Sequence, residues 1–176
     1  MGGVSSYTRP MPGRSDLQLL KSQACIPHSP RQLFMLLTNT SKRRTLEPNI
    51  RYCERSHVYS TNTFLDYYAY HAVWPTTARD FAAALHWQIV TRKRESIGAI
   101  SSPTDDGNDN GNNGDQTALV LVATSFPGGY DKAPSPPDHV RGELLISMSL
   151  LEPHKISGQD RPFCKLTRLL CYDLCG

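Results

Sequence analysis

Two ionisable residues, Asp66 and Arg168, lie within segments that the sequence predicts to be β-strands. A carboxylate or guanidinium that is buried without a partner costs several kcal/mol. We therefore expect the two side chains to pair with each other, to contact water, or to contact the polar head of a bound molecule.

The same residues give little support for catalysis or metal binding. The candidates for a catalytic acid and base are Asp66 with His71 or His57. Strand alternation, however, places Asp66 and His71 on opposite faces. The acidic run from Asp105 to Asp115 lacks the spacing and the closing glutamate of a calcium loop, and the five cysteines form no Cys-x-x-Cys pair. We expect no enzyme, no metal and no cofactor.

The segment around Asp66 is predicted to form a β-hairpin. Residues 63–73 and 81–90 both alternate as strands do, and a proline-containing connection joins them. Both strands carry apolar groups on each face, which predicts a sheet that is covered on one side and encloses a space on the other. The residues to which we assign a structural role in this connection are Trp74, Pro75, Arg79 and Asp80.

One helical segment is predicted near the start of the chain. Ser29 offers an N-cap with Pro30 at the first helical position, and an apolar run follows, so we expect a helix over residues 30–37 and a second turn near 41–46. The other predicted strands cover residues 17–26, 50–59, 118–126, 140–151 and 164–174. Strands therefore dominate an α+β chain.

Two segments have the composition of disordered chain. Residues 1–15 are rich in Gly, Ser and Pro, and residues 98–116 are rich in Gly, Asn, Asp and Ser, so we expect a disordered leader and a disordered insertion in a hairpin. Gly2 fits the short pattern for myristoylation, an alternative that stays open.

Length and charge narrow the function classes. A chain of 176 residues is expected to form one domain, and its net charge of +3 is too mild to indicate nucleic-acid binding. No apolar stretch reaches the roughly 18 residues of a membrane span, and the start lacks the organisation of a secretory signal. We expect a cytoplasmic monomer, with peripheral membrane association left open.

Three segments resemble the steroidogenic-acute-regulatory-related lipid transfer (START) family. Residues 73–81, Val-Trp-Pro-Thr-Thr-Ala-Arg-Asp-Phe, are similar to the hairpin of that family, which carries Trp-Pro or Phe-Pro and then Arg-Asp-Phe. Residues 138–143 are similar to its Val-Arg-Gly-Glu strand start, and residues 164–176 to its last strand. The resemblance spans residues 16–176 and implies a helix-grip fold, in which a curved antiparallel sheet surrounds a lipid cavity.

The resemblance also sets expectations for the end of the chain and for its hairpin. START domains close with a long C-terminal helix that covers the cavity, so we expect a domain truncated before that lid. The Val-Trp-Pro sequence of this hairpin is most similar to that of the ceramide-transfer branch of the family. The polar residues that hold ceramide there map onto His57, Ala78 and Ser125, and Ala78 has no side-chain hydrogen bond to offer.

The resemblance further implies which side chains face the cavity. Asp66 occupies a slot that is acidic in sterol-binding members, but the arginine that pairs with it there is replaced by Leu85. Arg168 stands where relatives carry an aromatic residue, so our hypothesis is that it binds a lipid phosphate or pairs with Asp66. The expected ligand-binding residues are Asp66, Tyr68, Tyr70, Leu85, Trp87, Ala123, Ser125, Met148, Arg168 and Tyr172.

The function that this resemblance implies is the binding of one lipid and its transfer between membranes, through transient contact with the membrane surface. The lipid class stays open among sterol, phospholipid and ceramide. An aromatic cage for a choline head, built from Tyr68, Tyr70, Trp87 and Tyr172, is a further option. The alternatives are a non-transferring lipid-sensing or regulatory module, an inactive truncated module and, less favoured, a helix-grip enzyme.

Overall fold

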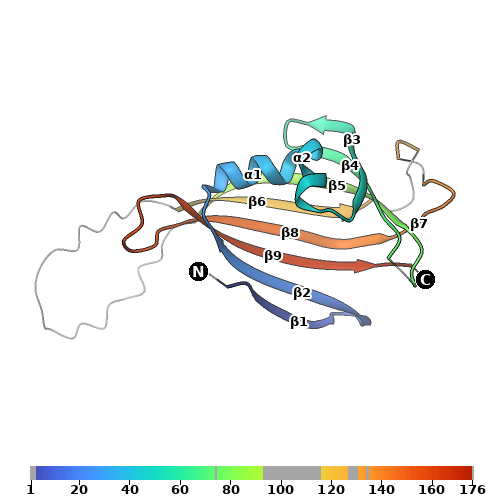
Figure 1. Ribbon diagram of the computed structural model, residues 1–176, viewed down its shortest axis with the longest axis horizontal. Helices are drawn as coiled ribbons and strands as arrows, with labels where there is room; N and C mark the ends of the chain where they lie inside the picture. The colour runs from blue at the N-terminus through green and yellow to red at the C-terminus, as the bar shows by residue number, and fades with distance from the viewer. Residues whose placement is uncertain (1–2, 74, 93–115, 127–130, 134, 176) are drawn as a thin grey trace, which may run out of the picture.

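A single antiparallel sheet with two helices across one face makes up the described chain (Figure 1). The computed structural model describes residues 3–73, 75–92, 116–126, 131–133 and 135–175. The helices are α1 (Pro30–Thr38) and α2 (Thr40–Leu46). The strands are β1 (Ser5–Met11), β2 (Arg14–Ile26), β3 (Ile50–Ser60), β4 (Thr63–Tyr70), β5 (Arg79–Arg92), β6 (Gln116–Ser125), β7 (Val140–Arg141), β8 (Glu143–His154) and β9 (Phe163–Asp173).

The strand order is β1-β2-β9-β8-β6-β5-β4-β3, and the short β7 pairs in parallel with β5. Because β2 lies beside β9, segments from the two ends of the sequence are neighbours in the sheet. Figure 1 shows α1 and α2 on the same side of the sheet. One face of the sheet is therefore partly covered by helices, as a helix-grip fold requires.

Helix α1 begins where the sequence predicted. The Ser29 hydroxyl accepts a hydrogen bond from the backbone N–H of Gln32 at 3.2 Å, and the Gln32 side-chain oxygen accepts one from the backbone N–H of Ser29 at 2.9 Å. This reciprocal capping box satisfies two amides that the helix itself cannot pair. Leu33 then packs into a core cluster with Leu121, Leu151 and Cys164, which fixes α1 over β6, β8 and β9.

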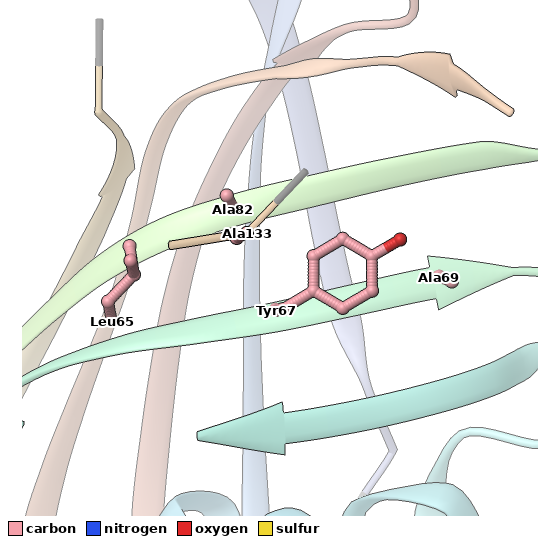
Figure 2. Close-up of a cluster of buried hydrophobic side chains, with 5 residues drawn as sticks. All are labelled: Leu65, Tyr67, Ala69, Ala82 and Ala133. Carbon is pink, nitrogen blue, oxygen red and sulfur yellow. The ribbon is translucent and has the colours of Figure 1, made fainter. Parts of the chain in front are cut away.

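The opposite face of the hairpin strands is covered as well. Alternate residues of β4 point away from the helices, where Leu65, Tyr67 and Ala69 form a buried cluster with Ala82 and Ala133 (Figure 2). Ala133 comes from the segment before β7 and is only 4% exposed. β4 and β5 therefore carry apolar residues on both faces because their outer face is also covered.

The leader is the clearest departure from the sequence-based expectation. Residues 5–11 form β1, which pairs with β2 from Ser5↔Gln23 to Met11↔Arg14, so the prediction of disorder was wrong for these residues. Almost every side chain of β1 is exposed, and backbone pairing rather than apolar burial holds it.

The predicted strand over residues 140–151 is divided into β7 and β8, and the remaining differences concern element ends. β4 stops at Tyr70 rather than at residue 73, and β5 begins at Arg79. The expected insertion at 98–116 lies outside the described residues except for Gln116, where β6 begins, and Gly2 and Trp74 also lie outside them.

Candidate functional site

A cavity of about 520 Å³ opens between the helices and the inner face of the sheet. Its lining comes from the ends of α1 and α2, from strands β4, β5, β6, β8 and β9, and from the connection between β4 and β5. This volume is within the range that single small molecules occupy in proteins. The cavity is therefore the candidate site.

Six of the ten residues that the sequence assigned to ligand binding line this cavity. They are Tyr68, Tyr70, Leu85, Ala123, Arg168 and Tyr172. The inner faces that the resemblance implied for β4, β5, β6 and β9 are therefore the faces that line the cavity.

Asp66 is not at the cavity wall. Asp66 is 1% exposed as a residue, and its carboxylate accepts hydrogen bonds from Arg55 Nε at 2.9 Å and from the Tyr68 hydroxyl at 3.3 Å. Arg55 comes from the neighbouring strand β3 and also lies over the Phe64 ring, 3.7 Å from its centroid. The alternative in which Asp66 pairs with Arg168 was wrong, because Arg55 already neutralises this carboxylate.

Two further expected residues are used by the fold. The Ser125 hydroxyl accepts a hydrogen bond from the backbone N–H of Leu144 at 2.8 Å and is not part of the described lining. Trp87 packs edge-on against Phe34 of α1, with 4.9 Å between ring centroids, and so belongs to the core below the helix. An aromatic cage that includes Trp87 is therefore not formed at the cavity wall.

Met148 lies on the outer face of β8, and the prediction that it faces the cavity was wrong. Leu144 pairs with Tyr172 while Ile146 pairs with Cys171, so β8 contains one extra residue at this point. Such a bulge shifts the alternation of every residue that follows it. As a result Ser147 and Ser149 line the cavity, in place of Ile146 and Met148.

An aromatic series runs along one side of the cavity. The rings of Tyr70 and Phe81 are 5.8 Å apart and nearly perpendicular, and those of Phe81 and Tyr172 are 6.5 Å apart. The Tyr70 hydroxyl lies 3.5 Å from a carboxylate oxygen of Glu47, and burial, aided by that carboxylate, raises the pKa of Tyr70 to about 12. Tyr70 is therefore neutral at physiological pH.

Charged groups in the lining come mainly from arginine. Arg43 donates to Glu47 at 2.9 Å and to the Leu37 carbonyl at 3.2 Å, and its guanidinium lies 5.3 Å from the centre of the Tyr68 ring. The side chain of Arg168, in contrast, makes no hydrogen bond or ion pair with any residue in the described part of the chain. Burial and the neighbouring charge of Arg43 lower the pKa of Arg168.

The two charged residues at the start of β5 form hydrogen bonds with distant parts of the chain. Asp80 is fully buried and accepts hydrogen bonds from Arg141 and from the Ser135 hydroxyl, both at 2.9 Å. Arg79 donates to the Leu174 carbonyl at 2.7 Å and to the Thr77 carbonyl at 2.9 Å. These contacts tie the start of β5 to β7 and to the end of β9.

Sequence reasoning missed Arg55, Arg43, Ser147 and Ser149. Arg55 was hidden because the register of β3 against β4 is irregular between Arg55 and His57. Arg43 could have been found from its spacing to Glu47, since residues four apart on a helix face each other.

Comparison with known proteins identifies the architecture. No family model matches the sequence, and no curated protein matches it. Three human structures resemble the chain. The StarD13 (DLC2) lipid transfer and protein localization domain does so with a TM-score of 0.70 and 16% sequence identity. STARD10 has a TM-score of 0.68 and 18% identity, and StAR-related lipid transfer protein 5 has a TM-score of 0.70 and 15% identity.

The match extends over nearly the whole chain. It covers 99%, 100% and 99% of the chain and 72%, 59% and 69% of those structures, in the same order. The chain thus spans between 59% and 72% of the length of these structures. At such low identity the likeness concerns the fold, and it confirms the expected curved antiparallel sheet around a cavity.

Proposed function

From the START helix-grip fold that this chain has, we propose that it binds a single lipid in its cavity and transfers that lipid between membranes. The cavity itself carries the proposal. Its walls include Leu85, Leu121, Leu144 and Leu170, which offer apolar surface to an acyl chain or ring system. Each Å² of apolar ligand surface removed from water contributes about 25 cal/mol, which offsets extraction from a bilayer.

The names of the similar structures agree with this proposal. One of them is described as a lipid transfer and protein localization domain, and another as a lipid transfer protein. We extend lipid binding to this chain because its cavity occupies the inner face of the same fold. The residues that we propose to contact the lipid are Tyr68, Tyr70, Leu85, Ala123, Arg168 and Tyr172.

The connection between β4 and β5 marks the route of entry. His71, Val73, Thr76 and Thr77 all line the cavity and are all exposed, and Leu174, the residue after β9, lines it as well. Val73 is 60% exposed, although it is apolar. None of the described helices is long and apolar enough to cross a membrane. We propose that this rim touches the membrane surface transiently while the lipid passes.

The test is to incubate the purified chain with liposomes of mixed composition, re-isolate it, and identify bound lipid by native mass spectrometry. A fluorescent-lipid assay between donor and acceptor vesicles then measures transfer. We expect a bound lipid and a transfer rate that rises with protein concentration. Bound lipid without transfer supports the sensing alternative, and the absence of bound lipid refutes the proposal.

A matched pair of variants connects the result to the cavity. Ala123 lines the cavity, so Ala123→Phe fills part of the space that a lipid needs. Gln88 is exposed on β5, so Gln88→Phe adds the same ring outside the cavity. We expect the first variant to lose bound lipid and the second to keep it, with both remaining folded by circular dichroism.

A further inference from the structure

Polar groups without partners gather at the part of the cavity wall formed by β8 and β9. Ser149 lies directly across from Arg168, and Ser147 lies across from Leu170, so the two hydroxyls and the guanidinium belong to adjacent positions of one strand pair. All three side chains line the cavity. Neither serine hydroxyl forms a side-chain hydrogen bond with any other described residue, and Ser149 is only 7% exposed.

The balance of charge in the cavity favours an anion. Three arginines and one glutamate occur among the described lining residues, an excess of two positive charges. Glu47 is already paired with Arg43 at 2.9 Å. The nearby buried carboxylate of Asp66 is taken by Arg55 at 2.9 Å. The charge of Glu47 favours the charged form of Arg168, but no carboxylate of the described chain forms an ion pair with this arginine.

A guanidinium cannot escape this situation by losing its proton, because arginine remains charged in proteins. Burial and the charge of Arg43 make the charged form of Arg168 less stable than it is in water, and so lower the pKa of this residue. A planar guanidinium donates two parallel hydrogen bonds to a carboxylate or phosphate, and serine hydroxyls add further donors. The arrangement is thus suited to an oxyanion that arrives with the ligand.

We propose that Arg168, Ser147 and Ser149 bind the anionic head group of the lipid, a carboxylate or phosphate, while the leucine-lined walls hold its apolar part. This inference rests on the proposed function, since it assigns a head-group class to the same cavity. A phosphocholine head would bring a positive charge together with its phosphate, so we expect the cavity to prefer a head group with net negative charge beside Arg168 and Arg43.

The experiment compares three amphiphiles with the same acyl chain: a fatty acid, a lysophosphatidic acid and a neutral monoacylglycerol. Binding of each to the full chain is measured by titration calorimetry, below the concentration at which micelles form. We expect at least one of the two anionic amphiphiles to bind about tenfold more tightly than the neutral one, as a charge-assisted hydrogen bond implies. The two anionic arms show whether the site takes carboxylate or phosphate.

Inorganic phosphate, tested as a competitor of lysophosphatidic acid, separates a lipid head from a free ion. We expect it to compete only weakly, because it lacks the apolar part. Equal binding of all three amphiphiles overturns the inference while it leaves lipid binding intact. Competition by inorganic phosphate at the affinity of lysophosphatidic acid overturns it in favour of a free anion. Failure of all three to bind refutes both this inference and lipid binding.

Variants then test the residues. Arg168→Gln removes the charge in the cavity, and Lys21→Gln removes the same charge from an exposed position on the neighbouring strand β2. We expect Arg168→Gln to weaken binding of the preferred anion about tenfold and to leave the monoacylglycerol unchanged, whereas Lys21→Gln binds like the wild type. An equal loss for neutral and anionic amphiphiles in Arg168→Gln overturns the head-group role.

Discussion

Arg55 Nε donates a hydrogen bond to Asp66 Oδ1 at 2.9 Å, across the pair of strands β3 and β4. The aspartate side chain is 2% exposed and the arginine side chain 28%. The arginine can therefore reach water if the pair is broken, whereas the carboxylate cannot. This asymmetry decides which substitution is the more damaging.

We predict that Arg55→Met destabilises the fold by about 3 kcal/mol, because it leaves the Asp66 carboxylate buried without its main partner. Arg51→Met is the matched control, since Arg51 lies on the same strand and its pair with Asp138 is exposed on both sides. That control should change stability by less than about 1 kcal/mol. Urea unfolding followed by circular dichroism measures both values, and similar losses for the two variants would contradict the prediction.

Gly142 is the second structural prediction. A Cβ atom added there would lie 2.5 Å from the Phe81 ring, which lines the cavity. We expect Gly142→Ala to push this ring out of place, to cost about 1 to 3 kcal/mol, and to weaken lipid binding. Thermal unfolding and the amphiphile titrations measure the two effects.

Gly3→Ala serves as the control for that substitution, since nothing lies within 4 Å of a Cβ atom at Gly3. The control should leave both stability and binding unchanged. If Gly142→Ala has no more effect than Gly3→Ala, then the close approach of Phe81 does not require a glycine at position 142.

The capping box of α1 gives a third prediction. Ser29→Ala removes the hydroxyl that caps the Gln32 amide and should destabilise the chain by about 1 kcal/mol. Ser157→Ala, at an exposed serine in the turn between β8 and β9, should have no measurable effect. Because the Gln32 amide loses its hydrogen-bond acceptor, amide hydrogen exchange should also become faster in the first turn of α1. An unchanged exchange rate would show that the cap is dispensable.

The sequence predicted those parts of the fold whose signals are local. Ser29 and Pro30 mark the start of α1, and apolar residues on both faces mark β4 and β5, because capping and strand alternation need no knowledge of distant partners. Strand β1 has no such signal, since its side chains are nearly all exposed and its partner β2 supplies the hydrogen bonds.

The candidate site was predictable only as far as the alternation held. It placed Arg168 correctly on the inner face of β9, but the extra residue near Leu145 in β8 exchanged Met148 for Ser149 at the wall. β8 has no glycine or proline near Leu145 from which the bulge could have been predicted. The partner of Asp66 was equally hidden, because it depends on the register between two strands rather than on any motif.

The cysteines give the last prediction. Burial raises the pKa of Cys53 to about 12 and that of Cys164 to about 11, while Cys175 is exposed. Because the thiolate is the reactive form, a pKa of about 12 leaves roughly one Cys53 thiol in ten thousand ionised at pH 8. Buried Cys164 and Cys171 are shielded as well.

We therefore expect iodoacetamide at pH 8 to modify Cys175 first, and Cys53, Cys164 and Cys171 only slowly, as measured by peptide mass spectrometry over time. Raising the pH to 9.5 should speed the reaction at Cys53 while it stays far slower than at Cys175, since that pH is still well below the raised pKa of Cys53. In urea all the thiols should react alike. Rapid modification of Cys53 in the native chain would mean that the wall formed by β3 and β4 opens to water.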